Sequence, residues 1–400
     1  MFKSLSFKVI IFGFIFTFFS SFGQSFFLGL FNSSIRDALS ITQGQFGSIY
    51  ASATLLSSFF LIWVGKKIDD INIFKFALFV ILLLSFSCFF FSKISSISFL
   101  FIAIFLMRFS GQGMMSHTAT TTISRFFTKS RGKALSTSWF GLSTAEFILP
   151  VLIVYLLTIT AWQDIWIAIS ILVLIFLPII SFALIKNLNF DSREETDQKE
   201  LRNIKQWKRT EVLKDYRFYI VCLNMLAMPW IATGVFVYQS FITESKDWGT
   251  YVIAQSFMVY SILSVITLLI SGFLIDKFTS RKLLIFMNIP LLLSTLVLIF
   301  FDTPSTAFIF LGLIGISNGL ANVLGSSTWA EIYGVKHIGS IKALTTALMV
   351  FSTAFGTALF GFLIDKGNSI EQIALVSFVY ILTSIVLLFF VRNKLNPKYI

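Results

Sequence analysis

Two charged residues, Arg108 and Glu146, lie deep inside apolar runs of the sequence. Arg108 is nine residues into the run 99–124, and Glu146 is twelve residues into the run 134–158. At about 1.5 Å per helical residue, both lie near the middle of a hydrocarbon core about 30 Å thick. A charge there costs about 2.5–3.5 kcal/mol, so it needs a partner or a water-filled cavity. The short loop between the runs predicts an antiparallel hairpin in which the two charges meet.

This polar centre has two interpretations. Intramembrane charges commonly handle a substrate or a proton, and Gln112 lies four residues after Arg108 on the same helical face. The alternative is a buried ion pair that only fixes the fourth helix on the fifth. Gly111 and Gly113 would let neighbouring helices approach closely in either case.

The first apolar run carries polar residues at spacing i, i+3, i+4 and i+7, namely Thr17, Ser20, Ser21 and Gln24. Such a stripe on an apolar helix is typical of cavity lining, and helix packing through small residues is the alternative. Weaker cavity candidates are Asn318, Asn322, Tyr238 and Gln239. We expect His117 to be a hydrogen-bonded packing residue rather than a proton relay.

The composition is that of a polytopic membrane protein. Of 400 residues, 56% are hydrophobic and 12% are charged, and the mean hydropathy is +0.86, which no soluble domain of this length matches. The 50 Phe residues are expected mainly at lipid-facing positions. Runs long enough to span a bilayer occur at 9–31, 47–64, 74–92, 99–124, 134–158, 163–185, 217–243, 251–275, 283–301, 306–333, 340–364 and 370–391. The sequence therefore predicts an all-α membrane protein with twelve transmembrane helices.

The distribution of basic residues predicts the orientation. Of the 31 Lys and Arg, 26 fall in alternate segments that include both termini, four fall in the other loops, and Arg108 is the remaining one. By the positive-inside rule, we predict that both termini lie in the cytoplasm. The expected location is the inner membrane of the cell. The alternation also argues against a nucleic-acid partner for the net charge of +12.

A long polar stretch divides the chain. We predict a six-helix bundle at 1–185, a cytoplasmic linker at 186–216 and a second six-helix bundle at 217–400. Within the linker, the mixture of Leu, Ile, Trp207 and basic residues at 201–213 predicts an amphipathic helix on the membrane surface. Similar short patterns recur at offsets of 207 (Gly65 and Gly272) and 209 (Lys133 and Lys342), which indicates two repeats of one ancestral bundle.

These features together resemble the major facilitator superfamily over the whole length of the chain. The family's loop signature, a glycine followed by an aspartate and basic residues, is matched by Gly272, Asp276, Lys277 and Arg281, and partly by Gly65 and Asp69. Its fourth-helix signature is similar to Arg108 through Gly113, shifted by one residue. The segment 125–134, with Gly141 and Glu146, is weakly similar to the monocarboxylate and oxalate/formate branches. The resemblance implies two pseudo-symmetric bundles with a midplane site between them, and a gate that involves the loop signatures. From its place at the inner end of the tenth helix, we expect Glu331 to pair with the basic Arg281 loop, in a gating or a structural role.

The predicted function is secondary active transport of a small polar organic solute, with an organic anion as one candidate, by alternating access with proton coupling or exchange. Export of amphipathic or drug-like compounds is one alternative, and a non-transporting sensor or scaffold is another. No enzyme motif, cofactor site or metal cluster is expected, since the two cysteines, Cys88 and Cys222, lie in separate apolar runs. The expected partners are a small-molecule substrate, protons and the lipid bilayer, and the expected state is a monomer.

Overall fold

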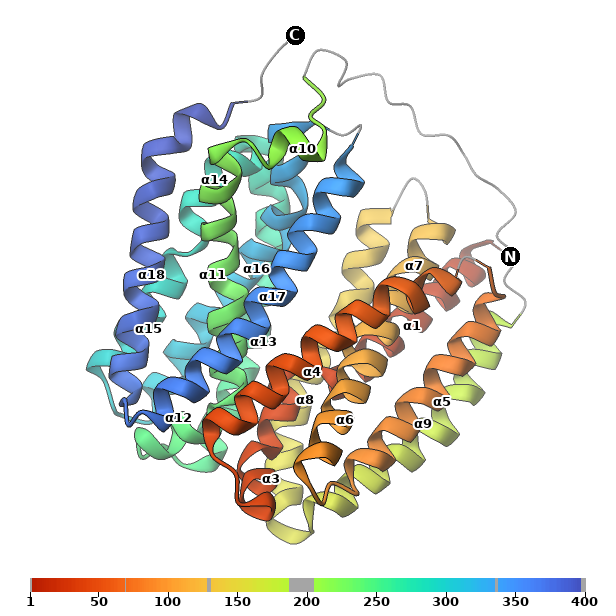
Figure 1. Ribbon diagram of the computed structural model, residues 1–400. Helices are drawn as coiled ribbons and strands as arrows, with labels where there is room; N and C mark the ends of the chain where they lie inside the picture. Colours follow the sequence, from red (N-terminus) through yellow and green to blue (C-terminus); the bar gives the residue numbers. More distant parts are fainter. Residues whose placement is uncertain (1, 69, 128–130, 187–204, 335–336, 397–400) are drawn as a thin grey trace. The chain divides into compact units, whose positions relative to one another are not determined.

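The computed structural model describes residues 2–68, 70–127, 131–186, 205–334 and 337–396. Side chains at 2–4, 131–133, 250, 276, 326, 339–340 and 343 are left out of this description. The described residues form helices and no strand (Figure 1). Twelve helical segments are long and apolar enough to cross a membrane, the first at Leu5–Gly23 and the last at Ile370–Lys394. The predicted all-α fold with twelve spans is confirmed.

Contacts divide the chain into two compact units. Unit 1 comprises Met1–Thr196 and Phe236–Ser240, and unit 2 comprises Asp197–Val235 and Phe241–Ile400. The predicted linker boundaries stay a prediction, because residues 187–204 are outside the described ranges. The assignment of Phe236–Ser240 to unit 1 was not anticipated from the sequence.

Unit 1 contains all of the irregular helices near the predicted charges. Its elements are α1 (Phe2–Ser20), η1 (Ser21–Gly23), α2 (Ser25–Leu28), η2 (Gly29–Phe31), α3 (Asn32–Leu39), α4 (Gln43–Val64), η3 (Gly65–Ile68), α5 (Ile73–Phe91), α6 (Ile97–Met107), η4 (Arg108–Met115), α7 (Ser116–Phe126), α8 (Arg131–Ile159) and α9 (Trp162–Ile185). Here α1 packs chiefly along α8, and α5 along α9.

Small residues set the contact between α1 and α8. A methyl group added at Gly141 would overlap the carbonyl oxygen of Phe14, and one added at Gly13 would lie 2.7 Å from Ser138 Oγ. The two backbones are therefore close enough for Thr17 Oγ1 to donate a hydrogen bond of 2.5 Å to the carbonyl of Ser138. Thr17 therefore takes part in helix packing, which was the alternative to lining a cavity.

Aromatic side chains fill the interior of unit 1 as well as its surface. The ring of Trp166 is fully buried and lies 5.5 Å from Phe27, 5.0 Å from Phe31 and 4.4 Å from Phe91 between centroids. The expectation that Phe mainly faces lipid is therefore only partly right. Phe79 and Phe86 are exposed on α5, whereas the Phe residues around the end of α1 form a core, because that interrupted helix leaves volume that large rings fill.

Unit 2 is built from longer helices and one broken one. Its elements are α10 (Arg209–Val212), α11 (Tyr216–Val237), α12 (Gln239–Ser245), α13 (Thr250–Phe278), α14 (Ser280–Met287), α15 (Ile289–Phe300), α16 (Thr306–Tyr333), α17 (Ile338–Asp365), α18 (Ile370–Val391) and η6 (Arg392–Lys394). The last two residues of α11 and the first two of α12 are grouped with unit 1. The break between α14 and α15 precedes Pro290, and Ser317 Oγ bridges it by donating to Met287 O and accepting from Leu291 N. The most extensive packing is between α13 and α16.

The linker differs from its prediction. Its described part, from residue 205, contains only the single turn α10, so an amphipathic helix over 201–213 is wrong for the described portion. Trp207 does not lie on a membrane surface: it is 6% exposed, packs against Tyr333 and donates its backbone N–H to the Tyr333 carbonyl at 3.0 Å. The described residues that precede α10, 205–208, are not helical.

Two ion-pair clusters lie at the ends of unit 2: the first is buried, and the second joins a buried lysine to an exposed and a partly exposed carboxylate. At the end that carries α10, Arg217 contacts both oxygens of Asp215, with Nη2 at 2.7 Å from Oδ2, and donates to the carbonyl of Lys394. Burial raises the pKa of Asp215, but the hydrogen bonds from Arg217 outweigh it, so that pKa lies below its usual value. At the opposite end, Lys246 Nζ lies 2.5 Å from Asp302 and 2.7 Å from Glu371.

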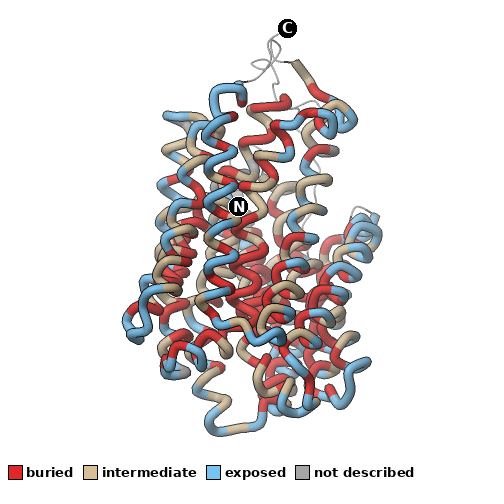
Figure 2. Tube along the Cα trace, turned by 60° about the vertical axis from the view of Figure 1, so that its left-hand side comes forward, coloured by how far each residue is buried: buried red, intermediate tan, exposed pale blue. Residues whose placement is uncertain are grey.

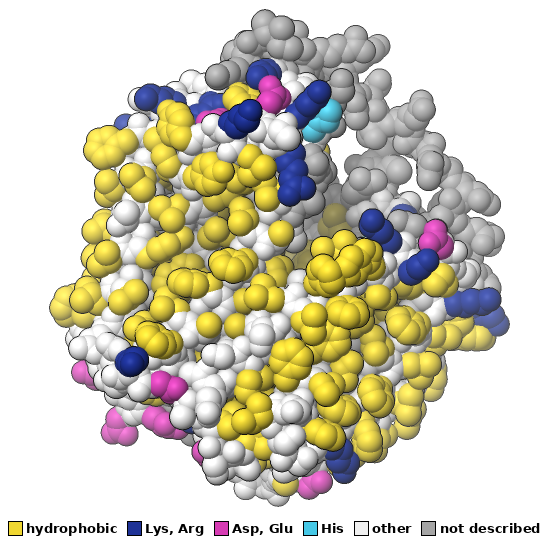
Figure 3. Space-filling model, viewed as in Figure 1, with side chains coloured by type: hydrophobic (Ala, Val, Ile, Leu, Met, Phe, Trp, Pro, Cys, Tyr) yellow, Lys and Arg dark blue, Asp and Glu magenta, His cyan; other side chains and the backbone are white. Residues whose placement is uncertain are grey.

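Exposed side chains match a lipid environment. Large apolar residues such as Phe273, Phe390 and Ile179 are 65–78% exposed, and exposed residues line the outward sides of the helices (Figure 2). On the face in Figure 3, hydrophobic side chains cover the middle of the helices and charged ones gather near their ends. This pattern is typical of helices in contact with acyl chains.

Candidate functional site

Two interruptions of helical backbone meet within unit 1. The first transmembrane helix changes at Ser21 to a short 3-10 turn, and Gln24 has extended backbone with φ −83° and ψ 153°. The fourth changes at Arg108 to a π-helix that ends at Met115. A methyl group added at Gly23 would overlap Met107 O and lie 2.9 Å from the Cα of Gly111. Only glycine permits this approach, and π-helical segments are frequent at functional sites.

Arg108 lies at this crossing. Its side chain is 3% exposed, and Nη1 donates to the carbonyl of Gly23 at 3.1 Å and to Ser25 Oγ at 3.3 Å. Its Cζ lies 5.3 Å from the centroid of the Tyr50 ring, and the hydroxyl of Tyr50 donates to Ser25 Oγ at 3.0 Å. The guanidinium thus binds a carbonyl that the interrupted helix leaves without a helical partner.

The predicted meeting of Arg108 and Glu146 is wrong in this structure. Arg108 forms no ion pair with any described carboxylate, and Glu146, 8% exposed, makes no hydrogen bond or ion pair with a described residue. The hairpin argument assumed that the fourth helix packs on the fifth at this depth. Instead α8, which carries Glu146, packs along α1, because Gly13 and Gly141 allow that contact to be closer. Arg108 and Glu146 are therefore two separate intramembrane charges.

The neighbouring polar candidates have different surroundings. Gln24 and Gln112 are partly exposed, and their side-chain amides make no hydrogen bond with a described residue. The backbones at the two residues are close in space, since a methyl group added at Gly23 would overlap the backbone N of Gln112. Ser20 is fully buried and donates to Thr17 O at 2.7 Å, and Ser21 Oγ is buried without a partner among the described residues. The structure therefore brings Gln24 and Gln112 to the Arg108 crossing and places Ser20 in helix packing.

The remaining cavity candidates are dispersed. Gln239 is 3% exposed and donates to the carbonyl of Phe26 at 2.9 Å. In unit 2, Asn318 donates to Ser264 Oγ at 2.9 Å and so joins α16 to α13. Asn322, one turn later, is exposed. These contacts give Gln239 and Asn318 evident packing roles.

The first loop signature contacts the end of the fourth helix. The carbonyl of Gly65 lies 3.0 Å from His117 Nε2, and the carbonyl of Ile68 accepts a hydrogen bond of 3.0 Å from Arg125 Nη1. His117 is hydrogen-bonded as predicted, and its assignment to packing rather than to a proton relay stays a prediction. Asp69 lies outside the described residues.

The second loop signature is organised by Glu331. Its carboxylate accepts the backbone N–H of Ser280 at 2.8 Å and that of Arg281 at 3.3 Å. Glu331 thus lies by the Arg281 loop as expected, although through the backbone at the N-terminus of α14 rather than through the guanidinium. Gly272 has open space beside it, and the side chain of Asp276 is outside the description.

Replacement of Glu331 by Ala should lower stability by about 1–2 kcal/mol, because two N–H groups and the positive end of the α14 dipole lose their partner. Thermal unfolding of the purified protein measures this loss. Glu244→Ala, at an exposed position, is the matched control. An unchanged melting temperature in Glu331→Ala would exclude the capping role.

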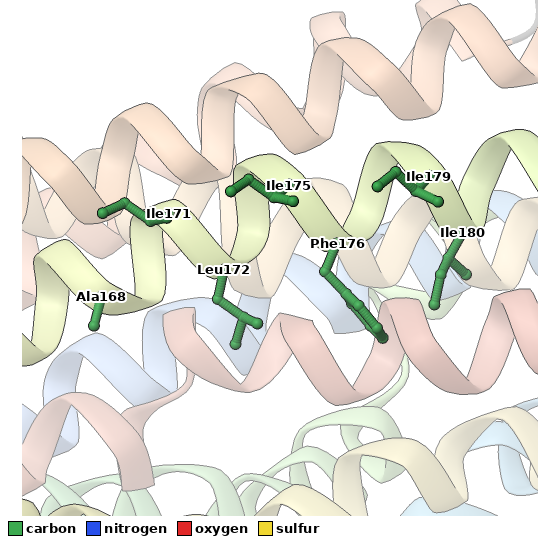
Figure 4. Close-up of a pocket in the computed structure, with 7 residues that line it drawn as sticks. All are labelled: Ala168, Ile171, Leu172, Ile175, Phe176, Ile179 and Ile180. Carbon is green, nitrogen blue, oxygen red and sulfur yellow. The ribbon is translucent and has the colours of Figure 1, made fainter.

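A large apolar groove runs along α9. It has a volume of about 660 Å³ and is lined by Ala168, Ile171, Leu172, Ile175, Phe176, Ile179 and Ile180. All seven residues come from α9 (Figure 4), and most are exposed. The groove contains no polar side chain, so it is suited to a lipid acyl chain and not to a polar solute.

Comparisons with known proteins agree with this architecture. No curated protein matches the sequence. A bacterial homologue of the human lysosomal transporter Spinster has a similar structure in its inward-facing, occupied conformation (TM-score 0.70, 12% identity, 99% of this chain and 98% of that chain). Its inward-facing, unoccupied conformation gives TM-score 0.71 with 11% identity and 99% coverage of both chains.

The nucleoside transporter NupG, in a mutant form, is also similar, with TM-score 0.66 and 14% identity over 98% of this chain and 99% of that chain. At these identities the likeness shows the fold. The model of the Major Facilitator Superfamily matches residues 13–341 and 221–399. By sequence and by fold, this chain is a transporter that belongs to the Major Facilitator Superfamily.

Proposed function

We propose that this chain is a secondary transporter of a small organic anion, that it works by alternating access, and that a proton or an exchanged solute drives it. The observation that carries the proposal is the buried guanidinium of Arg108 without a described counterion. A buried charge without an opposite charge is costly, by several kcal/mol per ion. Binding of an anion would remove that cost, which gives the site an intrinsic preference for negative solutes.

The surroundings of Arg108 support a binding role. Intramembrane sites in transporters are commonly formed by discontinuous helices whose unwound backbone supplies polar groups. Here the interruption at Gly23 and the π-helix at Arg108 provide such backbone. The amides of Gln24 and Gln112 each offer a donor and an acceptor that described residues do not use. We infer that they orient the polar part of the solute.

Glu146 is the candidate for proton coupling. It lies inside α8, is 8% exposed and has no described partner, and intramembrane carboxyl groups are typical of proton pathways. Because Glu146 does not pair with Arg108, the proton and the solute would be coupled through the conformational cycle and not through competition for one ion pair. Release of the proton would then require a movement of α8 that exposes the Glu146 carboxyl group to water.

Neither alternative function has a comparable observation in its favour. Drug-like substrates need a large apolar cavity, and the side chains that line the apolar groove on α9 are mostly exposed. A scaffold has no need for two charges at membrane depth that lack a partner among the described residues. For the orientation, we propose an inner-membrane protein with both termini and the linker in the cytoplasm, from the 26-to-4 distribution of basic residues.

Arg108→Lys should reduce transport by about 10- to 100-fold. Lysine retains the positive charge but cannot form the paired hydrogen bonds of a planar guanidinium, which are worth about 1.5–3 kcal/mol. Counterflow in proteoliposomes against small carboxylates, amino acids and sugars measures the effect and identifies the solute class. Arg209→Lys, exposed on α10, is the matched control. Transport of a neutral sugar, with full activity in Arg108→Lys, would refute the anion proposal.

A further inference from the structure

One edge of the Arg108 guanidinium donates hydrogen bonds to described residues, and another edge does not. Nη1 donates to both Gly23 O and Ser25 Oγ. Nε is buried without a hydrogen-bond partner, and Nη2 makes no hydrogen bond with a described residue. Nε–H and Nη2–H point from the same edge of the planar group, where their parallel directions match the two oxygens of one carboxylate.

Two residues hold the guanidinium in this orientation. Ser25 Oγ accepts from Nη1 while it also accepts from the hydroxyl of Tyr50 at 3.0 Å. The ring of Tyr50 lies 5.3 Å from Arg108 Cζ, so one side chain provides both a cation–π contact and the hydrogen bond that fixes Ser25. Tyr50 is 1% exposed and Ser25 is 8% exposed, so the surrounding side chains shield this small network from solvent.

We propose that Tyr50 and Ser25 are positioning residues that direct the Nε/Nη2 edge of Arg108 toward a singly charged, two-oxygen anionic group. The proposal rests on the proposed function and adds the charge and the mode of recognition of the solute. One guanidinium neutralises one negative charge. A dianion would leave a net charge in the membrane interior, where no second described cation contacts Arg108, and that excess is costly. The site should therefore select monocarboxylates over dianions and over neutral carboxamides.

A thermal-shift titration of the full-length purified protein tests this selectivity. The probes are lactate and lactamide, benzoate and benzamide, with malonate and sulfate as dianions at pH 7.5. At least one monocarboxylate should raise the melting temperature of the wild type by mass action, whereas its carboxamide and both dianions should not at the same concentration. Equal stabilisation by the carboxamide or by a dianion would overturn the proposed recognition.

The positioning role is tested with Tyr50→Phe and Ser25→Ala, which each remove one hydroxyl. The concentration of monocarboxylate for half-maximal stabilisation should rise about tenfold in either variant. The double variant should show little further rise, because both hydroxyls belong to one network. Matched controls are Ser52→Ala on the exposed face of α4 and Tyr155→Phe on α8, which should bind as the wild type does.

Counterflow exchange separates positioning from folding. In both variants the half-saturating substrate concentration should rise about tenfold while the maximal rate stays within about twofold. If a monocarboxylate stabilises the wild type and both variants bind it with the same affinity, the positioning role is refuted. The proposal of an anion transporter would still stand. If no probe stabilises the wild type and no anion exchanges, the proposed function itself fails.

Discussion

Glu146→Gln should abolish accumulation driven by a pH gradient while exchange of solute continues. Glutamine retains the shape of the side chain and a polar end but cannot carry a proton. One coupled proton across one pH unit supplies about 1.4 kcal/mol, which is about tenfold accumulation. The variant should show a concentration ratio near one under the same gradient. Proteoliposomes with an inward proton gradient provide the measurement.

The control for this experiment is Glu244→Gln, an equivalent change at an exposed position. Counterflow without a gradient should remain within a few-fold of the wild-type rate in Glu146→Gln, which shows that the protein folds and cycles. A folded Glu146→Gln protein that still accumulates solute tenfold would rule out Glu146 as the coupling group.

Arg217→Ala should destabilise unit 2 by about 3–5 kcal/mol. The change leaves Asp215 buried without its cation and removes the donor to the carbonyl of Lys394. Thermal unfolding of the purified protein measures the loss, with Arg209→Ala on α10 as the matched control. A melting temperature equal to that of the wild type would contradict the importance of this cluster.

The pH dependence gives an independent signature of the same change. In the wild type the pKa of Asp215 is lowered overall, so its contribution is present above about pH 4 and is lost as the pH falls through the lowered value. In Arg217→Ala the side-chain donors and the positive charge are lost, whereas the backbone N–H of residue 217 and the hydroxyl of Tyr333 still donate to Asp215. The stability difference between wild type and variant should therefore shrink as the pH falls and Asp215 becomes protonated, because a neutral carboxyl group no longer needs the cation.

The sequence was sufficient for the architecture because each span carries its own signal. Hydropathy over about 19 residues depends on composition alone, so twelve runs could be recognised without knowledge of their neighbours. The same reasoning identified Arg108 and Glu146 as buried charges. Whether they touch depends on which helices are in contact, and close packing at Gly13 and Gly141 decides this in favour of α1 and α8.

The backbone interruptions at the site were not predicted, for a related reason. A hydropathy window averages over an irregular turn, so Leu5–Gly23 and Ile97–Phe126 both read as continuous spans. The available signal was local: Gly23 next to Gln24, and the glycines at 111 and 113 after Ser110. Tyr50 and Ser25 carried no such signal, because nothing in their sequence context indicates that they contact Arg108.

The inclusion of Phe236–Ser240 in unit 1 has a consequence for experiments on fragments. Within unit 1 this short segment accepts a hydrogen bond from Asn32 at Val237 O and donates to the carbonyls of Gln43 and Phe26 from Tyr238 and Gln239. A polypeptide that stops within the linker would lack all three bonds. Co-expression of the two half-chains should therefore restore a structure that neither half attains alone, so that a gene split at the linker would be a complementation system and not a source of two independent domains.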